Sequence, residues 1–219
     1  MKFSKEDLLA LESQLSHPTG TKGISVAENM ATSNLSMITT SFESLNIQDK
    51  ETVLEIGHGN ASHVQKVLQK VKGVSFTGLE ISKTMHKEAL KNIVSLKNDL
   101  ELTFKLYNGV NFPFENNSFD KIASINTLYF WKQPKVILNE LYRILKSKGK
   151  IALCYADKDF METLPFVGSK FRLYDKEEIL KLINSSPLQL ASFKSFEETV
   201  KNKLGEIVQR NYNIIVLNK

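Results

Sequence analysis

The sequence has little of what marks secreted, membrane-spanning or nucleic-acid-binding proteins. Its 219 residues include one cysteine, Cys154, which excludes an internal disulfide framework and suits a reducing compartment. No apolar run approaches the roughly 20 residues that a membrane-spanning helix needs, and the charged first residues do not form a secretory signal. The net charge of +5 is spread along the chain, without the block of like charges typical of a nucleic-acid arm. We therefore expect a cytoplasmic protein with neither a membrane nor a nucleic-acid partner.

The most informative stretch is an apolar run that ends in two closely spaced glycines. Residues 53–56 read as a short buried strand, interrupted by the carboxylate of Glu55. Gly57 and Gly59 allow a tight turn and a close approach of a ligand to the backbone. A buried carboxylate needs partners, so we expect Glu55 to face a ligand or backbone N–H groups. In open α/β sheets this place is the ligand crevice.

The periodicity of the rest of the chain predicts alternating helices and strands. Expected helices cover residues 5–15, 24–45 (as one helix or two), 62–71, 82–97, 134–145 with a stop at 146–149, and 175–183. Expected strands cover residues 53–56, 74–79, 102–106, 119–125, 151–155, 188–200 and 206–217, the last two forming a hairpin.

This order of elements predicts the fold class and the domain organisation. We expect an α/β fold: a doubly wound, mostly parallel seven-stranded sheet with a C-terminal antiparallel hairpin strand and N-terminal cap helices. Residues 1–219 form one domain, in which 50–156 are the cofactor-binding core and 157–219 carry a helix and the β-hairpin. Residues 1–46 cap the crevice or flank the sheet.

A second carboxylate narrows the class of ligand. Glu80 ends the second strand about 20 residues after the glycines, where an acid can accept hydrogen bonds from ribose hydroxyls. A dinucleotide favours a third glycine at position 62 and a positive helix end for its pyrophosphate. Ser62 and Glu55 disfavour that, so a ligand with a ribose and a cation fits better.

Four ordered motifs give the sequence a resemblance to the class I, Rossmann-like S-adenosylmethionine-dependent methyltransferases. The resemblance covers about residues 50–156 and lies in the segments 55–61, 78–82, 108–120 and 140–150. The chain departs from the family pattern at Ala61, where a third glycine is usual, and at Asn108, where an aspartate is usual.

The resemblance implies S-adenosyl-L-methionine as cofactor and assigns roles to residues. Glu55 would lie near the ammonium of the methionine part, Glu80 would hold the ribose and Ile81 would pack on the adenine. The remaining implied cofactor-binding residues are Gly57, His58, Gly59, Asn108, Gly109 and Asn126, with Asn126 beside the sulfonium. The sequence is equally consistent with Ile81 as an ordinary core residue. Asn126 could simply terminate a strand.

Catalytic residues are not fixed by these patterns. Methyl transfer depends mainly on positioning, and a base is needed only for a protonated nucleophile. Candidates for a base are His58, His63, Tyr129 and Tyr155. Asp157 and Asp159 are too weak a pattern for a metal site, so we expect no metal.

The expected acceptor is a small molecule. After the fourth strand the chain lacks the Pro-Pro turn of enzymes that methylate the amino groups of nucleic-acid bases. Methylation of cytosine at carbon 5 needs a cysteine nucleophile, but Cys154 lies in an apolar strand and is expected to be a small buried side chain. Helices in 5–45 and the segment 157–175 are expected to enclose the acceptor. Two alternatives stay open: an NAD(P)-binding oxidoreductase, or a methyltransferase-like protein that binds cofactor or RNA without catalysis. The identity of the acceptor, the methylated element and the oligomeric state do not follow from the sequence.

Overall fold

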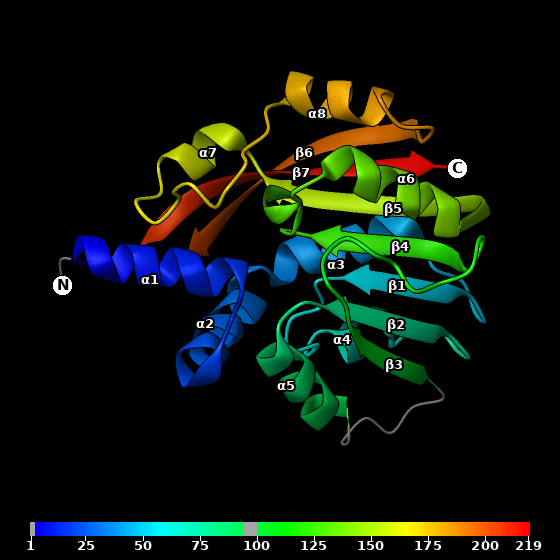
Figure 1. The fold of residues 1–219 in the computed structure, drawn as a ribbon, viewed down its shortest axis with the longest axis horizontal. Helices are drawn as coiled ribbons and strands as arrows, with labels where there is room; N and C mark the ends of the chain where they lie inside the picture. The colour runs from blue at the N-terminus through cyan, green and yellow to red at the C-terminus, as the bar shows by residue number, and fades with distance from the viewer. Residues whose placement is uncertain (1–2, 94–99) are drawn as a thin grey trace.

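A seven-stranded sheet forms the centre of the molecule in a computed structural model that describes residues 3–93 and 100–219 (Figure 1). The strand order is β3-β2-β1-β4-β5-β7-β6. The strands are β1 (Thr52–Ile56), β2 (Ser75–Glu80), β3 (Glu101–Leu106), β4 (Phe119–Ile125), β5 (Leu145–Ala156), β6 (Gln189–Lys201) and β7 (Ile207–Asn218). The predicted fold class is confirmed, including the C-terminal hairpin.

Strand directions bring several chain segments to one edge of the sheet. β3, β2, β1, β4 and β5 are parallel, β7 is antiparallel to β5, and β6 is antiparallel to β7. β6 therefore runs in the direction of the parallel strands. As a result, the β6–β7 turn lies at the same edge as the carboxyl ends of β1, β2, β4 and β5, where ligands bind in open α/β sheets.

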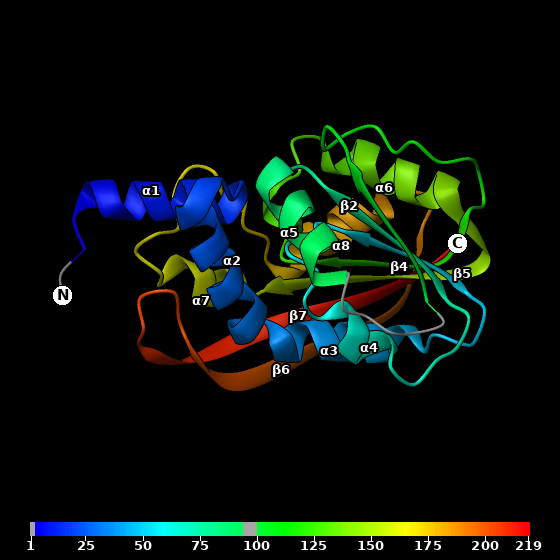
Figure 2. The same cartoon turned by 90° about the horizontal axis from the view of Figure 1, so that it is seen from below.

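Helices cover both faces of the sheet. They are α1 (Lys5–Ser16), α2 (Gly20–Ser33), α3 (Leu35–Leu45), α4 (Val64–Leu68), α5 (Lys83–Ile93), α6 (Pro134–Ile144), α7 (Lys158–Glu162) and α8 (Lys176–Asn184), with a 3-10 turn η1 (Leu128–Phe130). Buried side chains of α3, α4 and α5 join one apolar cluster and those of α6 and α8 join another. Figure 2 shows α6 on one side of the sheet and α3 and α4 on the other. Among the described residues, no helix is both long and apolar enough to cross a membrane.

The N-terminal segment consists of two abutting helices after α1, and they have different roles. α2 and α3 meet at Asn34, which is the C-terminal cap of the first and the N-terminal cap of the second. α3 packs on β4, β5 and β7 as part of the layer that covers the sheet. α1 and α2 lie beyond the carboxyl edge of the strands (Figure 1). Thus α3 flanks the sheet, whereas α1 and α2 stand beside the crevice.

Four predicted boundaries need correction or lie outside the described part, the first being the start of α2 at Gly20 rather than at residue 24. α4 is shorter than the predicted 62–71, because the backbone after it bonds the segment before β1: the N–H of Lys72 donates to Asp49 and that of Lys50 to the carbonyl of Lys72. β5 begins at Leu145, not Ile151, because Leu145 is buried and pairs with Phe119 ahead of a bulge. The predicted continuation of α5 from 94 to 97 falls outside the described residues. The short helix α7 was not predicted.

Candidate active site

A cleft with about 1030 Å³ of empty space, counting its opening to solvent, lies at the carboxyl edge of β1, β2 and β4. Most of the residues that the sequence nominated for cofactor binding line it: Glu55, Gly57, His58, Gly59, Glu80, Ile81, Gly109 and Asn126. α1, α2 and their connecting turn supply the opposite wall. The cleft therefore gathers residues from separate motifs at one place.

Glu80, the last residue of β2, is the most strongly bonded side chain of this cleft. Its Oε1 accepts the N–H groups of Ile81 at 2.8 Å and Ser82 at 2.9 Å, and its Oε2 accepts the N–H of Gly59 at 3.0 Å. Burial raises the pKa of the carboxyl group, and the three N–H donors act in the opposite direction. A carboxylate offers about four acceptor positions. One position on Oε2 therefore stays open to a ligand hydroxyl.

The glycine turn after β1 is shaped by left-handed backbone. Gly57 has φ +74°, and a Cβ there would clash with Cγ2 of Thr127. Gly59 has φ +57° and open space where a Cβ would stand, so a ligand can approach its backbone. Ala61 also has a positive φ, of 55°, which explains why glycine is usual at this position in the family. A residue other than glycine in this left-handed region costs roughly 1–2 kcal/mol of conformational free energy.

Glu55 is paired inside the protein. Side chains alternate along a strand, so Glu55 points to the face on which α4 begins, and its Oε2 lies 2.7 Å from Nε2 of His63. Glu55 is 2% exposed and His63 is 6% exposed. His63 thus gives the buried carboxylate a partner within the protein. The sequence predicted a ligand or backbone N–H groups as partners of Glu55, and not His63.

His58 is a neutral packing residue in this structure. Burial lowers the pKa of its imidazole to about 3, and its ring nitrogens have no hydrogen-bond partner among the described residues. The ring packs edge-on to Phe104 at 4.7 Å between centroids and sits against Gly78, where a Cβ would lie 2.5 Å from it. A group with so low a pKa is a poor proton acceptor near neutral pH.

The loop after β3 approaches the cleft through Gly109 and not through Asn108. A Cβ on Gly109 would lie 3.6 Å from Cγ2 of Ile81, so these residues face each other. Asn108 is exposed, and its Oδ1 accepts the N–H groups of Val110 at 3.0 Å and Asn111 at 2.8 Å. Its carbonyl is thus occupied within its own turn, and Asn108 does not line the cleft.

The turn between α1 and α2 is fastened to the end of β2. The hydroxyl of Ser82 donates to the carbonyl of Pro18 at 2.5 Å, and the N–H of Gly20 donates to Thr84 at 3.2 Å. His17 lies 3.3 Å from the carbonyl oxygen of Ile81. These contacts hold α1 and α2 against the strand end that carries Glu80.

Asn126 stands where the cleft meets a second cavity. It has φ 56°, and its side chain accepts a hydrogen bond from the Tyr129 hydroxyl at 3.1 Å. The Tyr129 hydroxyl also contacts the backbone of Ala156, and burial raises its pKa. Tyr155 is fully buried and lines neither cavity. Of the four candidate bases, the structure brings His58 and His63 to the cleft and Tyr129 to the second cavity.

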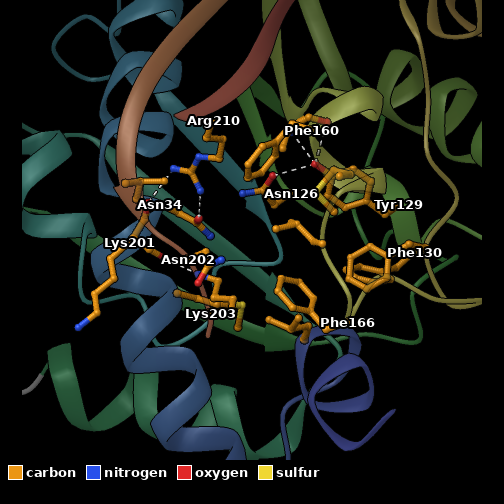
Figure 3. A pocket seen from close by; sticks show the side chains of 18 residues that line it. Asn34, Asn126, Tyr129, Phe130, Phe160, Phe166, Lys201, Asn202, Lys203 and Arg210 are labelled. Carbon is orange, nitrogen blue, oxygen red and sulfur yellow. Dashed lines mark hydrogen bonds between the residues drawn. The ribbon is translucent and has the colours of Figure 1, made fainter. Parts of the chain in front are cut away.

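The second cavity is mostly apolar, with five aromatic residues in its wall, and has about 610 Å³ of empty space, counting its opening to solvent (Figure 3). Its wall takes in the end of α2, η1, the end of β5, the segment 160–171 and the β6–β7 hairpin. It shares five residues with the cleft: Leu15, Met30, Asn34, Asn126 and Phe130. We call it the aromatic pocket, after the residues Tyr129, Phe130, Phe160, Phe166 and Phe171.

Sequence reasoning found two sides of this pocket and missed the third. The helices in 5–45 and the segment 157–175 were expected to enclose an acceptor, and both line the pocket. The hairpin residues 200–203 and Arg210 were not expected there. The one signal in the sequence for this third side was the predicted hairpin, because its pairing fixes the direction of β6 and so the edge at which the β6–β7 turn lies.

Asp157, which the sequence analysis considered with Asp159 as a weak metal pattern, caps α7 by accepting the N–H of Asp159 at 3.0 Å.

Comparisons with known proteins agree with this geometry. Residues 54–153 match the family model of a methyltransferase domain. The demethylmenaquinone methyltransferase of Tropheryma whipplei (strain Twist) is 28% identical over 161 residues, which are 72% of this chain and 62% of that protein. The 2-methyl-6-phytyl-1,4-hydroquinone methyltransferase 2 of Oryza sativa subsp. japonica is 24% identical over 59% of this chain and 36% of its own length.

A solved structure shares the fold. The S-adenosylmethionine-dependent methyltransferase from Methanosarcina mazei superposes with a TM-score of 0.65 at 18% identity, covering 79% of this chain and 94% of the other. At such identity the likeness concerns the fold. The family match spans the strands that build the cleft, and the sheet order and most of the nominated residues meet there, so fold, site and family match together support a class I S-adenosylmethionine-dependent methyltransferase domain.

Proposed function

We propose that this protein transfers a methyl group from S-adenosylmethionine to a small, largely apolar molecule held in the aromatic pocket. The observation that carries the proposal is the meeting of two unlike cavities at Asn126 and Phe130. One has a glycine turn and a buried carboxylate, and the other has aromatic walls. A cofactor and an acceptor in these cavities would adjoin, as methyl transfer requires.

The cleft fits the cofactor that the family implies. Glu80 keeps one acceptor position for a ribose hydroxyl, and the open space at Gly59 admits a ligand to the backbone. Ile81 and Gly109 lie against each other in the wall of the cleft, and an adenine would pack on this part of the wall. When bound, S-adenosylmethionine supplies a methyl group on a sulfonium with a good leaving group, so the protein mainly orients the reactants.

Two residues are proposed in altered roles. The carbonyl of Asn108 is occupied, so we assign adenine recognition to the backbone of Gly109. Glu55 reaches a ligand ammonium only by sharing its carboxylate with His63, and an imidazolium there would compete with that ammonium.

An apolar acceptor agrees with the named activities of the relatives. Two of these relatives are named for demethylmenaquinone and for a hydroquinone with a phytyl chain. This chain spans about 62% of the first relative and 36% of the second, so the acceptor of this protein has to be found by experiment. Cys154 is the single cysteine and is buried, which supports a cytoplasmic location.

The proposal is tested in two steps. Isothermal titration with S-adenosylhomocysteine is expected to give saturable binding, and absence of binding contradicts the proposal. Incubation with methyl-labelled S-adenosylmethionine and fractionated cell extract is then expected to label the apolar small-molecule fraction. Binding without label in any fraction would favour the alternative of a cofactor-binding protein without catalysis, and label in nucleic acid would contradict the small acceptor.

A further inference from the structure

The β6–β7 turn places an amino group without a counter-ion in the wall of the aromatic pocket. Lys203 lies in this turn, is partly buried and lines the pocket. Its Nζ donates a hydrogen bond to the hydroxyl of Ser33. Among the residues that the structure describes, no carboxylate lies within ion-pair distance of this Nζ. The hydrogen-bond partner of Lys203 is therefore a neutral hydroxyl and not a counter-ion.

The neighbouring cation is already neutralised. Arg210 donates to Glu198 through Nε at 3.0 Å and through Nη2 at 2.6 Å. Its remaining contacts go to Oδ1 of Asn34 at 2.9 Å and to the carbonyl of Ser33 at 2.7 Å. Arg210 therefore braces the wall and has little capacity left for a ligand.

The other polar side chains of the wall are also occupied within the protein. Asn202 donates its amide to Glu206 at 2.9 Å and accepts the N–H groups of Leu204 and Glu206, both at 2.9 Å. The Tyr129 hydroxyl is bonded to Asn126 and Ala156. Of the two lysines that line the pocket, Lys203 is thus the partly buried one with bonding capacity to spare, whereas Lys201 is exposed.

The environment of Lys203 leaves its charge poorly supported. Burial, together with the nearby charge of Arg210, lowers the pKa of the amine to about 7. Removal of a charged group from water costs free energy unless a partner of opposite charge replaces the water. Figure 3 shows Lys203 and Asn202 across the pocket from Phe130 and Tyr129, so a ligand that spans the pocket reaches both sides.

We infer that the molecule held in the aromatic pocket carries an anionic oxygen group, which Lys203 binds as an ion pair while the aromatic side chains hold its apolar body. This inference rests on the proposed function only in naming that molecule the methyl acceptor. Charge complementarity favours this ligand class, because an anionic oxygen group would supply the counter-ion that the amine of Lys203 lacks among the described residues.

The test compares two probes of nearly equal shape and different charge. We choose 2-naphthoate and the neutral 2-naphthamide, titrated calorimetrically below the pKa of Lys203. Wild type is expected to bind naphthoate at least about 10-fold more tightly, since a hydrogen bond to a charged group contributes about 1.5–3 kcal/mol. Lys203→Met is expected to remove this preference and leave naphthamide binding unchanged, and Lys203→Arg is expected to retain most of it.

Lys201 offers the matched control. It also lines the pocket, but it is exposed, and Figure 3 shows its side chain extending away from the other labelled residues. Lys201→Met removes the same charge two residues away and is expected to leave both affinities unchanged. An equal loss in both lysine variants would point to general electrostatics and overturn the inference.

Other outcomes are equally decisive. If wild type binds both probes equally, binds neither, or if Lys203→Met weakens both to the same extent, Lys203 does not recognise an anion. Thermal unfolding of each variant checks that the pocket is folded. Titration with S-adenosylhomocysteine separates the two proposals: loss of cofactor binding with intact naphthoate selectivity contradicts the proposed function and leaves the anion site standing.

Discussion

The cofactor cleft and the aromatic pocket adjoin, yet they are built in different ways. The polar groups of the cleft are side chains at strand ends and backbone groups, such as the N–H groups that donate to Glu80. The aromatic pocket is assembled from side chains of segments far apart in the sequence, from Leu15 to Arg210. A ligand in the cleft meets fixed amides, whereas a ligand in the pocket meets packed rings.

This difference indicates how each region tolerates change. Backbone donors and left-handed glycines are set by local chain geometry, so few substitutions can replace them. The apolar wall of the pocket tolerates substitutions that keep the volume, shape and polarity of the replaced side chain. We therefore expect mutations in the cleft to have large and local effects, and mutations around the pocket to have smaller effects on ligand selectivity.

The largest effect is expected from Glu80→Ala, which leaves the N–H groups of Gly59, Ile81 and Ser82 without their acceptor. We expect S-adenosylhomocysteine affinity to fall by about 100-fold and the free energy of unfolding to drop by several kcal/mol. Calorimetry and urea denaturation measure the two quantities. Glu80→Gln keeps one acceptor oxygen and should lie between the two; unchanged affinity in both variants would contradict the assigned ribose contact.

A pair of glycine variants separates steric contact from backbone strain in the same turn. Gly57→Ala brings a methyl group against Thr127, while Gly59→Ala enters open space, and both residues have positive φ. We expect a loss of about 3 kcal/mol in unfolding free energy for Gly57→Ala and about 1 kcal/mol for Gly59→Ala. Adding Thr127→Ser, which removes the contacting methyl, should restore part of the difference; no restoration would show that the contact is not the cause.

A smaller effect is expected where α1 is tied to the pocket wall. Oε1 of the buried Glu12 accepts the N–H of Lys170 at 2.7 Å, which holds the segment carrying Phe166 and Phe171. Glu12→Ala should weaken 2-naphthamide binding a few-fold and cost about 1 kcal/mol of stability. S-adenosylhomocysteine affinity should stay unchanged.

The exposed Glu28 on α2 provides the control for this variant. Glu28→Ala removes the same charge from a helix beside the cleft and should change neither affinity. If Glu12→Ala weakens cofactor binding as strongly as probe binding, the two regions are coupled and the contrast between them fails.

The last expected effect is a pH dependence of stability. The pKa of Lys203 is about 7 in the folded protein, below its ordinary value of 10.5, so between these values the unfolded chain binds more protons. The unfavourable contribution of this amine is complete below pH 7 and fades as the pH rises toward 10.5. Lys203→Met should therefore be more stable than wild type near neutrality, with the difference shrinking as the pH rises toward 10.5. Urea denaturation across this range measures it; a pH-independent difference would contradict the lowered pKa.

Most of the sheet was predictable because its determinants are local. The apolar runs, the glycines after β1 and the acid at the end of β2 indicated a crevice, and the structure places these residues in one cleft. The start of β5 was predicted wrongly, because Leu145 is drawn into the sheet by its pairing with Phe119 rather than by a local pattern. The residues nominated for cofactor contact stay predictions until a ligand is bound.

The sequence by itself determined the order of the strands and main helices, the resemblance to methyltransferases and most of the nominated residues that line the cleft, since periodicity, glycine and strand-end acids act over short distances along the chain. Only the tertiary structure decided the partner of Glu55, the occupied carbonyl of Asn108 and the approach of Lys203 to the aromatic pocket. These features depend on which side chains meet across the fold. The physical reason is that a charge obtains its counter-ion, or lacks one, from neighbours that the linear order of the chain does not name.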